Sequence, residues 1–286
     1  MTAIKIQKLY PKDFPPQLNE IPGPPKILYL RGTLPPDGTV LLSVVGSRAH
    51  TPYGKSACEE IIAGLAGAPL AIVSGLALGI DGIAHRAALK AGLTTVAVPG
   101  SGLSTEVLYP FAHHGLAEKI IADGGALLSE FEPDFRATPW SFPQRNRIMA
   151  GLSKATLVIE AGERSGTLIT ARLALDYNRD VLAVPGSIFS ESSRGVHRLL
   201  RQGATPVTSS ADVLDALDLL PATEHCAVQR DVTDDEAAVL LLISEPLQRD
   251  ELIRKMDMPT AAAQTILTAM ELKGIITESL GLIRLT

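Results

Sequence analysis

The sequence predicts an α/β protein in which a large domain with a parallel sheet is followed by a small domain with the outline of a winged helix. From Val40 to about residue 208, short apolar runs alternate with helical stretches, which is typical of a parallel sheet covered by helices on both faces. Aromatic residues make up only 4 % of the 286 residues, which favours close packing of helices on a sheet over a β-sandwich. A polar stretch at 221–235 then breaks the alternation, so we expect the second domain to begin after it.

Residues 1–39 are rich in proline and contain one strand-like run, Ile27–Arg31. Proline has no backbone N–H to donate to a neighbouring strand. We therefore expect this segment to be an arm packed on the large domain, which is expected to span 40–220.

The large domain contains six apolar runs with the composition of buried strands. They lie at 40–46, 70–75, 94–100, 126–130, 156–161 and 180–186. The helical stretches between them lie at 53–65, 80–91, 113–123, 145–151, 166–177 and 196–202. Parallel sheets bind ligands at the carboxyl ends of their strands, so we expect a ligand site in the turns that follow these runs.

The linker at 221–235 is followed by a domain at 236–286. Helical segments at 236–243, 249–256 and 260–273, and then a hairpin turning near Leu280-Gly281, give the winged-helix outline. Residues 225–286 hold 6 basic and 10 acidic residues, against 20 and 21 in the remainder. The formal charge of −5 argues against a broad basic surface. A local basic site is expected in the large domain, because screening limits the reach of each charge to about 8–10 Å.

The composition also excludes several classes of protein. No stretch approaches the roughly 20 uncharged apolar residues of a membrane span, and the first residues lack the apolar run of a signal peptide. Cys58 and Cys226 are too few for a disulfide framework and fit no zinc-ligand spacing. We therefore expect a cytoplasmic protein that holds no metal and no cofactor.

The first motif spans 44–60, where a strand ends in Gly46-Ser47-Arg48 and a helix starts soon after Pro52. Glycine lets the backbone approach a ligand, and the N–H groups of a helix start attract phosphate. Arg48 can bond phosphate in bidentate fashion. A tight strand-to-helix turn with a solvated arginine explains the segment equally well, and both interpretations stay open.

Residues 49–56 also fit a relaxed P-loop pattern, with Ala49 in place of the first glycine. A P-loop wraps phosphate with consecutive backbone N–H groups, and Pro52 removes one from the middle of the wrap. The strands downstream offer only Glu160 where a magnesium-binding aspartate is expected. The sequence therefore argues against a P-loop ATPase, which is kept as an alternative.

At 74–92 a glycine-rich turn runs into a helix that carries Asp81 and His85 on one face, four residues apart. Such a pair could serve acid–base chemistry. No serine or cysteine stands in a nucleophile elbow to complete a triad. We favour the interpretation that the carboxylate satisfies the histidine and the pair pins the helix to its loop.

The segment 140–153 carries the residue types of a single-strand binder, because Arg145, Asn146 and Arg147 lie beside Trp140 and Phe142. Proteins that bind single strands pair cations for the backbone with aromatic faces for the bases, at about 1–3 kcal/mol per stacked base. If instead the aromatic residues are core and the arginines form surface ion pairs, the segment has no such role.

Two other turns suit a phosphate. The Gly-x-Gly of residues 98–110 lacks the third glycine of a dinucleotide site and indicates only a phosphate-compatible turn. Within 164–175, Ser165, Gly166 and Thr167 open a helix and are able to donate hydrogen bonds to a phosphate.

Taken together, these segments resemble the DNA-processing protein A (DprA/Smf) family. The matching stretches follow the family order between residue 10 and about residue 208. They include VVGSR, SGLALGIDGIAHRAAL, VPGSGLSTEVLYP, FPQRNRIMAGLS and VIEAGERSGTLITARLALDYNRDVLAVPGS. The winged-helix outline also matches the usual ending of the family.

The resemblance implies an extended Rossmann-like fold that binds single-stranded DNA and forms homodimers, and that does not catalyse a reaction. It also implies that the protein protects incoming strands and helps load the RecA recombinase in natural transformation. In the family, the Gly-Ser-Arg segment and the FP-x-RNR region line the DNA pocket. With the helix start at 165–167 added, the expected single-stranded-DNA-binding residues here are Gly46, Ser47, Arg48, Phe142, Arg145, Asn146, Arg147, Ser165, Gly166 and Thr167.

The chain departs from the family pattern in two places. The family usually has a lysine or arginine where Phe111 and Ala112 stand, so one phosphate contact is missing or comes from His113 or His114. We also expect the chain to lack the helical N-terminal domain that many members carry.

The rival interpretation is a nucleotide-binding enzyme similar to lysine-decarboxylase-like phosphoribohydrolases, whose motif carries a catalytic glutamate where Ala171 stands here.

Overall fold

The computed structural model describes residues 5–219, 236, 238–240, 243, 247–256, 258–273, 276–279 and 282–285. The chain divides into two compact units, Met1–Leu220 and Pro221–Thr286. The predicted linker at 221–235 and the predicted turn at Leu280-Gly281 lie outside the described residues, and the helix predicted at 236–243 is described only in part.

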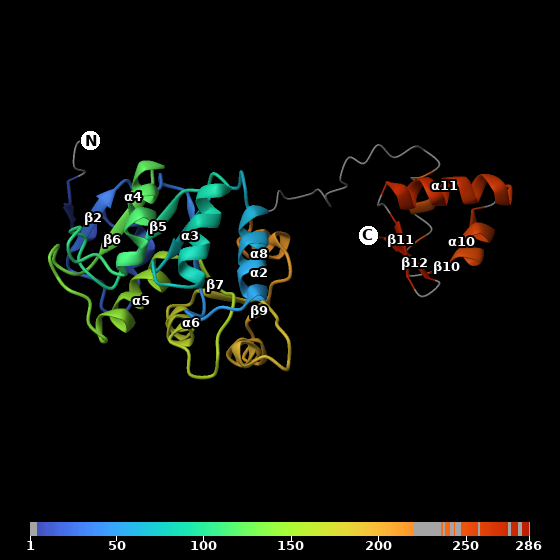
Figure 1. The fold of residues 1–286 in the computed structure, drawn as a ribbon. Coiled ribbons are helices and arrows are strands. Elements are labelled where there is room, and N and C mark those ends of the chain that lie inside the picture. Colours follow the sequence, from blue (N-terminus) through green and yellow to red (C-terminus); the bar gives the residue numbers. More distant parts are fainter. Residues whose placement is uncertain are drawn as a thin grey trace. The chain divides into compact units, whose positions relative to one another are not determined.

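A nine-stranded sheet forms the centre of the larger unit, in the order β1-β2-β6-β5-β4-β3-β7-β8-β9 (Figure 1). The strands are β1 (Gln7–Leu9), β2 (Leu28–Gly32), β3 (Val40–Val45), β4 (Leu70–Ser74), β5 (Thr95–Ala97), β6 (Ala126–Ser129), β7 (Ala155–Val158), β8 (Asp180–Ala183) and β9 (Thr205–Pro206). From β6 to β9 every neighbouring pair is parallel, as the continuous apolar runs predicted. The N-terminal segment adds β1 and β2 as antiparallel strands beside β6.

Helices cover both faces of this sheet (Figure 1). They are α1 (Pro16–Asn19), α2 (Pro52–Ala63), α3 (Ile80–Lys90), α4 (His114–Ala122), α5 (Ser141–Leu152), α6 (Thr167–Asp176), α7 (Arg194–Arg201) and α8 (Ser210–Ala216). Side chains alternate between the two faces of a strand, so Val45 packs with α1, α5, α6 and α7 while Val44 packs with α2, α3 and α8. Helix α4 packs on β5 and β6. The prediction of an α/β fold with a mostly parallel sheet is confirmed.

Helix α5 begins at Ser141, four residues before the start that the sequence predicted. Pro143 is tolerated in the first turn of this helix, where its missing N–H has no partner within the helix. As a result, Phe142 belongs to the first turn of α5, and the polar residues Arg145, Asn146 and Arg147 follow in the same helix.

The strand order reverses at β3, because β4, β5 and β6 follow on one side of it and β7, β8 and β9 on the other. In open α/β sheets a crevice forms at the carboxyl ends of the strands where the order reverses. Here that point lies between the loop after β3 and the loop after β7, which places the two loops next to each other.

The smaller unit contains α10 (Arg249–Lys255), α11 (Thr260–Leu272) and the strands β10 (Leu247–Gln248), β11 (Ile276–Ser279) and β12 (Leu282–Leu285). The strands form a sheet in the order β10-β12-β11 with antiparallel neighbours. Leu252, Leu267, Met270 and Ile283 are buried in one core between these elements. Helices followed by a two-stranded wing form a winged helix, as the sequence predicted.

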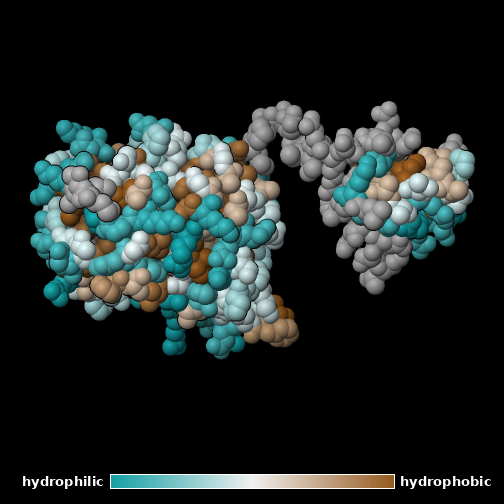
Figure 2. Space-filling view, turned by 45° about the horizontal axis from the view of Figure 1, so that its top comes forward, coloured by the Kyte–Doolittle hydropathy of each residue, from teal (hydrophilic) through white to brown (hydrophobic). Residues whose placement is uncertain are grey.

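Hydrophilic and hydrophobic residues are interspersed over the visible face of the larger unit (Figure 2). The most exposed large apolar side chains of the described residues are Phe111, Ile188 and Phe189. Within the same part of the chain, every helix is too short or too polar to cross a membrane.

Candidate functional site

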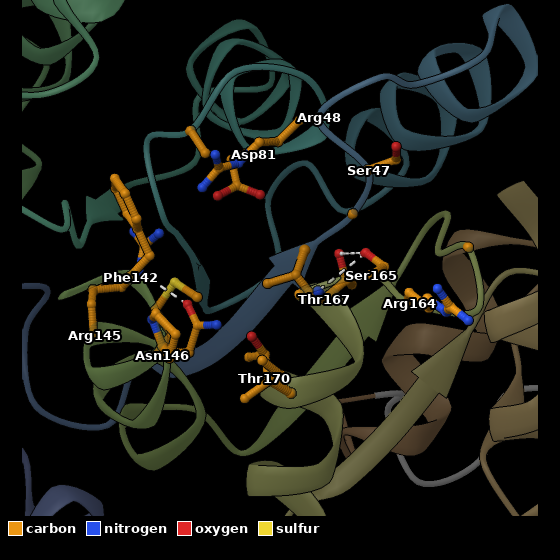
Figure 3. A pocket seen from close by; sticks show the side chains of 18 of the residues that line it. Ser47, Arg48, Asp81, Phe142, Arg145, Asn146, Arg164, Ser165, Thr167 and Thr170 are labelled. Carbon is orange, nitrogen blue, oxygen red and sulfur yellow. Dashed lines mark hydrogen bonds between the residues drawn. The ribbon is translucent and has the colours of Figure 1, made fainter. Parts of the chain in front are cut away.

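A cavity of about 800 Å³ lies at the carboxyl ends of β3 and β7, where the strand order reverses. Its volume falls within the range of ligand sites, about 300–1,000 Å³. Figure 3 shows side chains from the β3 loop, α5 and the start of α6 around it. The lining includes Val45, Gly46, Ser47, Arg48, Ala77, Asp81, Phe142, Arg145, Asn146, Met149, Arg164, Ser165, Gly166, Thr167, Ile169 and Thr170. Nine of the ten residues that the sequence predicted for the site are therefore in this lining, and Arg147 is not.

The loop after β3 is held against the start of α3. A Cβ at Gly46 would lie 2.6 Å from the side chain of Ile80, so only glycine allows this approach. The N–H of Ile80 donates to the carbonyl of Ser47 at 3.2 Å, and the Ser47 hydroxyl accepts from the N–H of Ala49 at 3.1 Å. These contacts fix the backbone that presents Arg48 at the edge of the cavity.

Arg48 is exposed, and it forms no ion pair with any residue that the structure describes. Its guanidinium carbon lies 5.0 Å from the centre of the Phe142 ring, which is within the range of a cation–π contact. The ring of Tyr109 lies 5.6 Å from that of Phe142. Arg48 thus combines an available positive charge with an aromatic surface.

Arg145 has a different environment, although the sequence placed it in the same role as Arg48. Its side chain is buried, and its Nη1 donates to the backbone carbonyls of Gly75 and Val98, which follow β4 and β5. Burial lowers the pKa of Arg145 to about 10, while the carboxylate of Asp81 acts to raise it. Arg145 therefore remains charged at neutral pH and ties the strand ends together beneath the cavity.

Asp81 and His85 do not pair, which corrects the expectation that the carboxylate satisfies the histidine. One Asp81 carboxylate oxygen accepts from the N–H of Gly75 at 3.1 Å, so Asp81 alone pins α3 to its loop. The Nδ1 of His85 lies 2.7 Å from the hydroxyl of Thr95. Burial raises the pKa of Asp81 and lowers that of His85 to about 3.

Arg147 does not line the cavity, although it was predicted to line the site with Arg145. It pairs with Glu130 and donates from Nη1 to the carbonyl of Gly23 at 2.8 Å, so its contacts tie α5 to the N-terminal segment. Asn146 does line the cavity, and its Oδ1 accepts from the Nε of Arg145 at 3.1 Å.

The aromatic residues at the start of α5 are neither fully core nor fully free. Phe142 lines the cavity. Trp140 is 55 % exposed and packs edge-on against Phe131 and Phe135, with ring centres 5.7 Å and 5.5 Å away. The interpretation that both aromatic residues are simply core is therefore wrong.

The start of α6 forms the wall opposite Arg48. The Ser165 hydroxyl accepts from the N–H of Thr167 at 3.2 Å and lies 2.9 Å from the Thr167 hydroxyl. No acidic residue stands in the first turn of α6. Arg164 precedes this turn, is exposed and lines the cavity. The positive end of a helix with a neighbouring arginine suits an anion.

The start of α2, by contrast, is already occupied by a carboxylate of the protein. Glu160, buried at the end of β7, accepts from the N–H of Thr51 at 2.9 Å and from its hydroxyl at 2.5 Å. These bonds favour the interpretation of a tight strand-to-helix turn over that of a phosphate at this helix start, both of which the sequence left open. The P-loop interpretation fails, because α2 begins at Pro52 and Lys55 lies inside the helix.

The family usually has a lysine or arginine where Phe111 stands, and the neighbouring histidines do not take its place in the cavity. The Nδ1 of His113 bonds to the carbonyl of Leu76 at 2.8 Å, and the Nε2 of His114 bonds to that of Leu108 at 2.7 Å. Neither histidine is in the cavity lining. Phe111 itself is 82 % exposed.

Sequence reasoning missed Arg164, which lines the cavity, and Tyr109, whose ring lies beside that of Phe142. Arg164 directly precedes the predicted Ser165, so a charge beside a helix start was the signal that could have found it. Tyr109 lies two residues before Phe111, in a segment that we interpreted from the sequence only as a phosphate-compatible turn. Its spacing in the sequence does not indicate contact with Phe142. Of the residues that the structure describes, no three His, Cys, Asp or Glu side chains are placed to hold a metal.

Comparison with known proteins identifies the family of this chain. The family model of DNA recombination-mediator protein A matches residues 5–218, and the model of the DprA winged helix domain matches residues 221–281. The chain is 45 % identical over 204 residues to protein Smf of Escherichia coli, covering 71 % of this chain and 54 % of that protein. It is also 45 % identical over 201 residues to DNA processing protein DprA of Streptococcus pneumoniae, covering 70 % of each. The chain thus spans about half the length of the Escherichia coli relative.

Solved structures agree with this match. The X-ray structure of DNA processing protein A from Streptococcus pneumoniae has a TM-score of 0.69 at 42 % identity, covering 74 % of this chain and 75 % of that one. The structure of DNA processing protein A from Helicobacter pylori, described for its unique single-stranded DNA binding mode, has a TM-score of 0.65 at 30 % identity, covering 75 % of this chain and 96 % of that one. The fold, the winged-helix ending and the matched residues together show that this chain belongs to the DNA recombination-mediator protein A (DprA/Smf) family.

Proposed function

We propose that this protein binds single-stranded DNA in the cavity between the β3 loop, α5 and α6. The observation that carries the proposal is the exposed guanidinium of Arg48, which has no carboxylate partner among the described residues and lies over Phe142. A cation for the backbone beside an aromatic face for the bases is the combination that single-strand binders use.

The electrostatics of the cavity support an anionic ligand. Arg48, Arg145 and Arg164 line it, against the single carboxylate of Asp81. Burial raises the pKa of that carboxyl group, while the charges of Arg145 and Arg48 act to lower it. The formal charge of the whole chain is −5, so this local excess of arginine is not a consequence of composition.

The two walls suggest how a strand lies. Phosphates would meet Arg48 and the positive end of α6, near Gly166 and Thr167, because that helix start lacks an acidic residue. Bases would stack on Phe142 and Tyr109. The single-stranded DNA binding mode described for the Helicobacter pylori relative supports the same class of ligand.

We further propose that the protein acts in the cytoplasm as a homodimer in natural transformation and recombination, where it protects incoming single strands and helps load the RecA recombinase. The family assignment supports this role. A filament-formation assay with RecA on single-stranded DNA tests it, and faster filament growth in the presence of the protein is expected.

The role is one of binding and not of catalysis. Ala171, which stands where the rival phosphoribohydrolases carry a catalytic glutamate, is completely buried on the side of α6 that faces the core. The carboxylate of Glu160 is committed to Thr51. A phosphate-release assay with ATP and nucleoside monophosphates is expected to show no turnover, and release that Lys55→Ala abolishes would support the ATPase alternative.

The decisive test is oligo-dT binding by Arg48→Ala, with Arg86→Ala as the control because Arg86 is exposed on α3 and outside the cavity lining. Arg48→Ala is expected to weaken binding about 10-fold or more, or about 1.4 kcal/mol, within the range of a charge-assisted hydrogen bond. The slope of log affinity against log salt should lose about 0.7, the share of one contact on a single strand. Unchanged affinity in Arg48→Ala, or an equal loss in Arg86→Ala, would contradict the proposal.

A further inference from the structure

A second hollow, of about 540 Å³, adjoins the cavity on the outer side of α6. Three arginines from two helices and one loop line it: Arg164 before α6, Arg172 within α6 and Arg198 within α7. Glu163 is its one acidic residue. The hollow therefore carries an excess of positive charge in a protein whose total charge is negative.

The hollow and the cavity share part of their walls. Arg164, Ser165, Gly166 and Ile169 line both of them. Ile169 and Arg172 are three residues apart on α6 and so lie on one face of the helix. Ile169 is 43 % exposed, so an apolar side chain stands between Arg164 and Arg172 along the chain in this lining. The cavity is therefore continuous with the hollow along α6, and a strand that follows this shared wall reaches Arg172 and Arg198.

The three arginines are available to a ligand. Each is exposed, and none forms an ion pair or a side-chain hydrogen bond with the residues that the structure describes. Like charges gathered in one hollow repel one another, and this repulsion is relieved when an anion enters. A polyanion with a phosphate at every unit relieves it at several positions along its length.

We infer that the hollow lined by Arg164, Arg172 and Arg198 binds the backbone of the same DNA strand after it leaves the cavity. The inference rests on the proposed function, because the strand reaches the hollow only through the shared wall at Ser165 and Gly166. It adds a contact region that acts on strands longer than the cavity and has no effect on a strand short enough to end inside it.

The test compares two oligo-dT lengths, about six and about twenty nucleotides, within and beyond the site sizes of single-strand binders. The variant is Arg172→Ala/Arg198→Ala, which leaves Arg164 in place because Arg164 also lines the cavity. The control is Arg86→Ala/Lys90→Ala, which removes two exposed cations from α3 on the opposite face of the sheet. Thermal unfolding checks that both variants are folded.

We expect the Arg172→Ala/Arg198→Ala protein to bind the short oligonucleotide like the wild type and the long one about 5- to 10-fold more weakly. Its salt slope on the long strand should be about 1.4 less steep, since each lost contact is worth about 0.7. The control should change neither.

Equal losses on both lengths, or no loss on either, would overturn the inference while leaving the proposed function intact. In the second case the hollow is left to another partner, such as an acidic protein surface. A wild-type protein that binds neither oligonucleotide would refute the proposed function itself, and the inference with it. The two failures are therefore distinguished by which protein fails to bind.

Discussion

Arg48 and Arg145 line the same cavity, but their exposure gives them different roles. Arg48 is exposed and lies over an aromatic ring, whereas Arg145 is buried and bonds to the carbonyls of Gly75 and Val98. We expect Arg145→Ala to lower the free energy of unfolding by about 3–5 kcal/mol, because it leaves the buried Asp81 charge and two carbonyls uncompensated. Urea unfolding measures this. Arg48→Ala should stay within about 0.5 kcal/mol of the wild type, and equal stability of the two variants would contradict the assignment.

His85 makes the stability of the fold depend on pH. Burial lowers its pKa from 6.5 to about 3, so between these values the unfolded chain binds a proton that the folded protein does not. Stability from His85 is therefore complete above pH 6.5 and is lost as the pH falls toward 3. We expect the wild type to lose about 2 kcal/mol between pH 7 and pH 5 relative to His85→Gln.

Urea unfolding at the two pH values gives this difference directly. Asp81 shifts in the opposite sense, since burial raises its pKa, but it is present in both proteins and its contribution cancels. A constant difference between wild type and His85→Gln across this range would show that His85 is protonated in the folded state.

At the scale of single elements, helix α2 shows how a buried carboxylate replaces a ligand at a helix start. Glu160 accepts from the N–H and the hydroxyl of Thr51 and faces the positive end of the helix. Glu160→Gln places a donor against these donors and is expected to lower the free energy of unfolding by about 1–2 kcal/mol. Oligo-dT affinity should change less than about 2-fold. A 10-fold change in affinity without loss of stability would place the start of α2 in the DNA interface.

The elements of the larger unit were largely predictable from the sequence, because buried parallel strands read as continuous apolar runs and helices fill the intervals. The short strands β1 and β9 and the helix α8 were not, since two to seven residues give no periodicity to detect. The start of α5 was missed because proline in a first turn looks the same in sequence as proline that precedes a helix.

The site was predictable in its location and less so in the role of each residue. Strand ends at a reversal of strand order indicated where a ligand binds. Arg145 and Arg147 look equivalent in the sequence, yet one is buried and the other pairs with Glu130. The spacing of Ile148, Met149 and Leu152 from Arg145 places all four on one helical face, and this was the available signal. No signal in the sequence indicated the carboxylate at the start of α2, because Glu160 is 109 residues from Thr51 along the chain.

At the scale of the whole molecule, the part of the winged helix that the structure describes carries little that would attract DNA. Lys273 pairs with Glu236 at 2.8 Å and Arg249 with Glu271 at 2.5 Å, so these cations are already neutralised. The helix that would read a major groove in a helix-turn-helix, here α11, has no arginine. This unit suits contact with another protein better than contact with phosphate.

We therefore expect a truncated chain ending at residue 220 to bind oligo-dT and duplex DNA within about 3-fold of the full chain. The larger unit has its own core and contains the whole cavity, so it is expected to fold alone. Titrations of both proteins with both DNAs make the comparison. A loss of more than about 10-fold on either DNA would show that the winged helix binds DNA.

Trp140 gives the protein an optical signal of its own. It is the single tryptophan of the sequence, and it lies half-exposed at the start of α5. Phe142 and Pro143, which follow two and three residues later, line the cavity. All indole fluorescence of this chain therefore comes from a residue next to the lining of the candidate site. Nucleobases that stack beside it quench indole emission, so unlabelled protein and unlabelled DNA suffice to follow occupancy in real time, with no fluorophore placed on either partner.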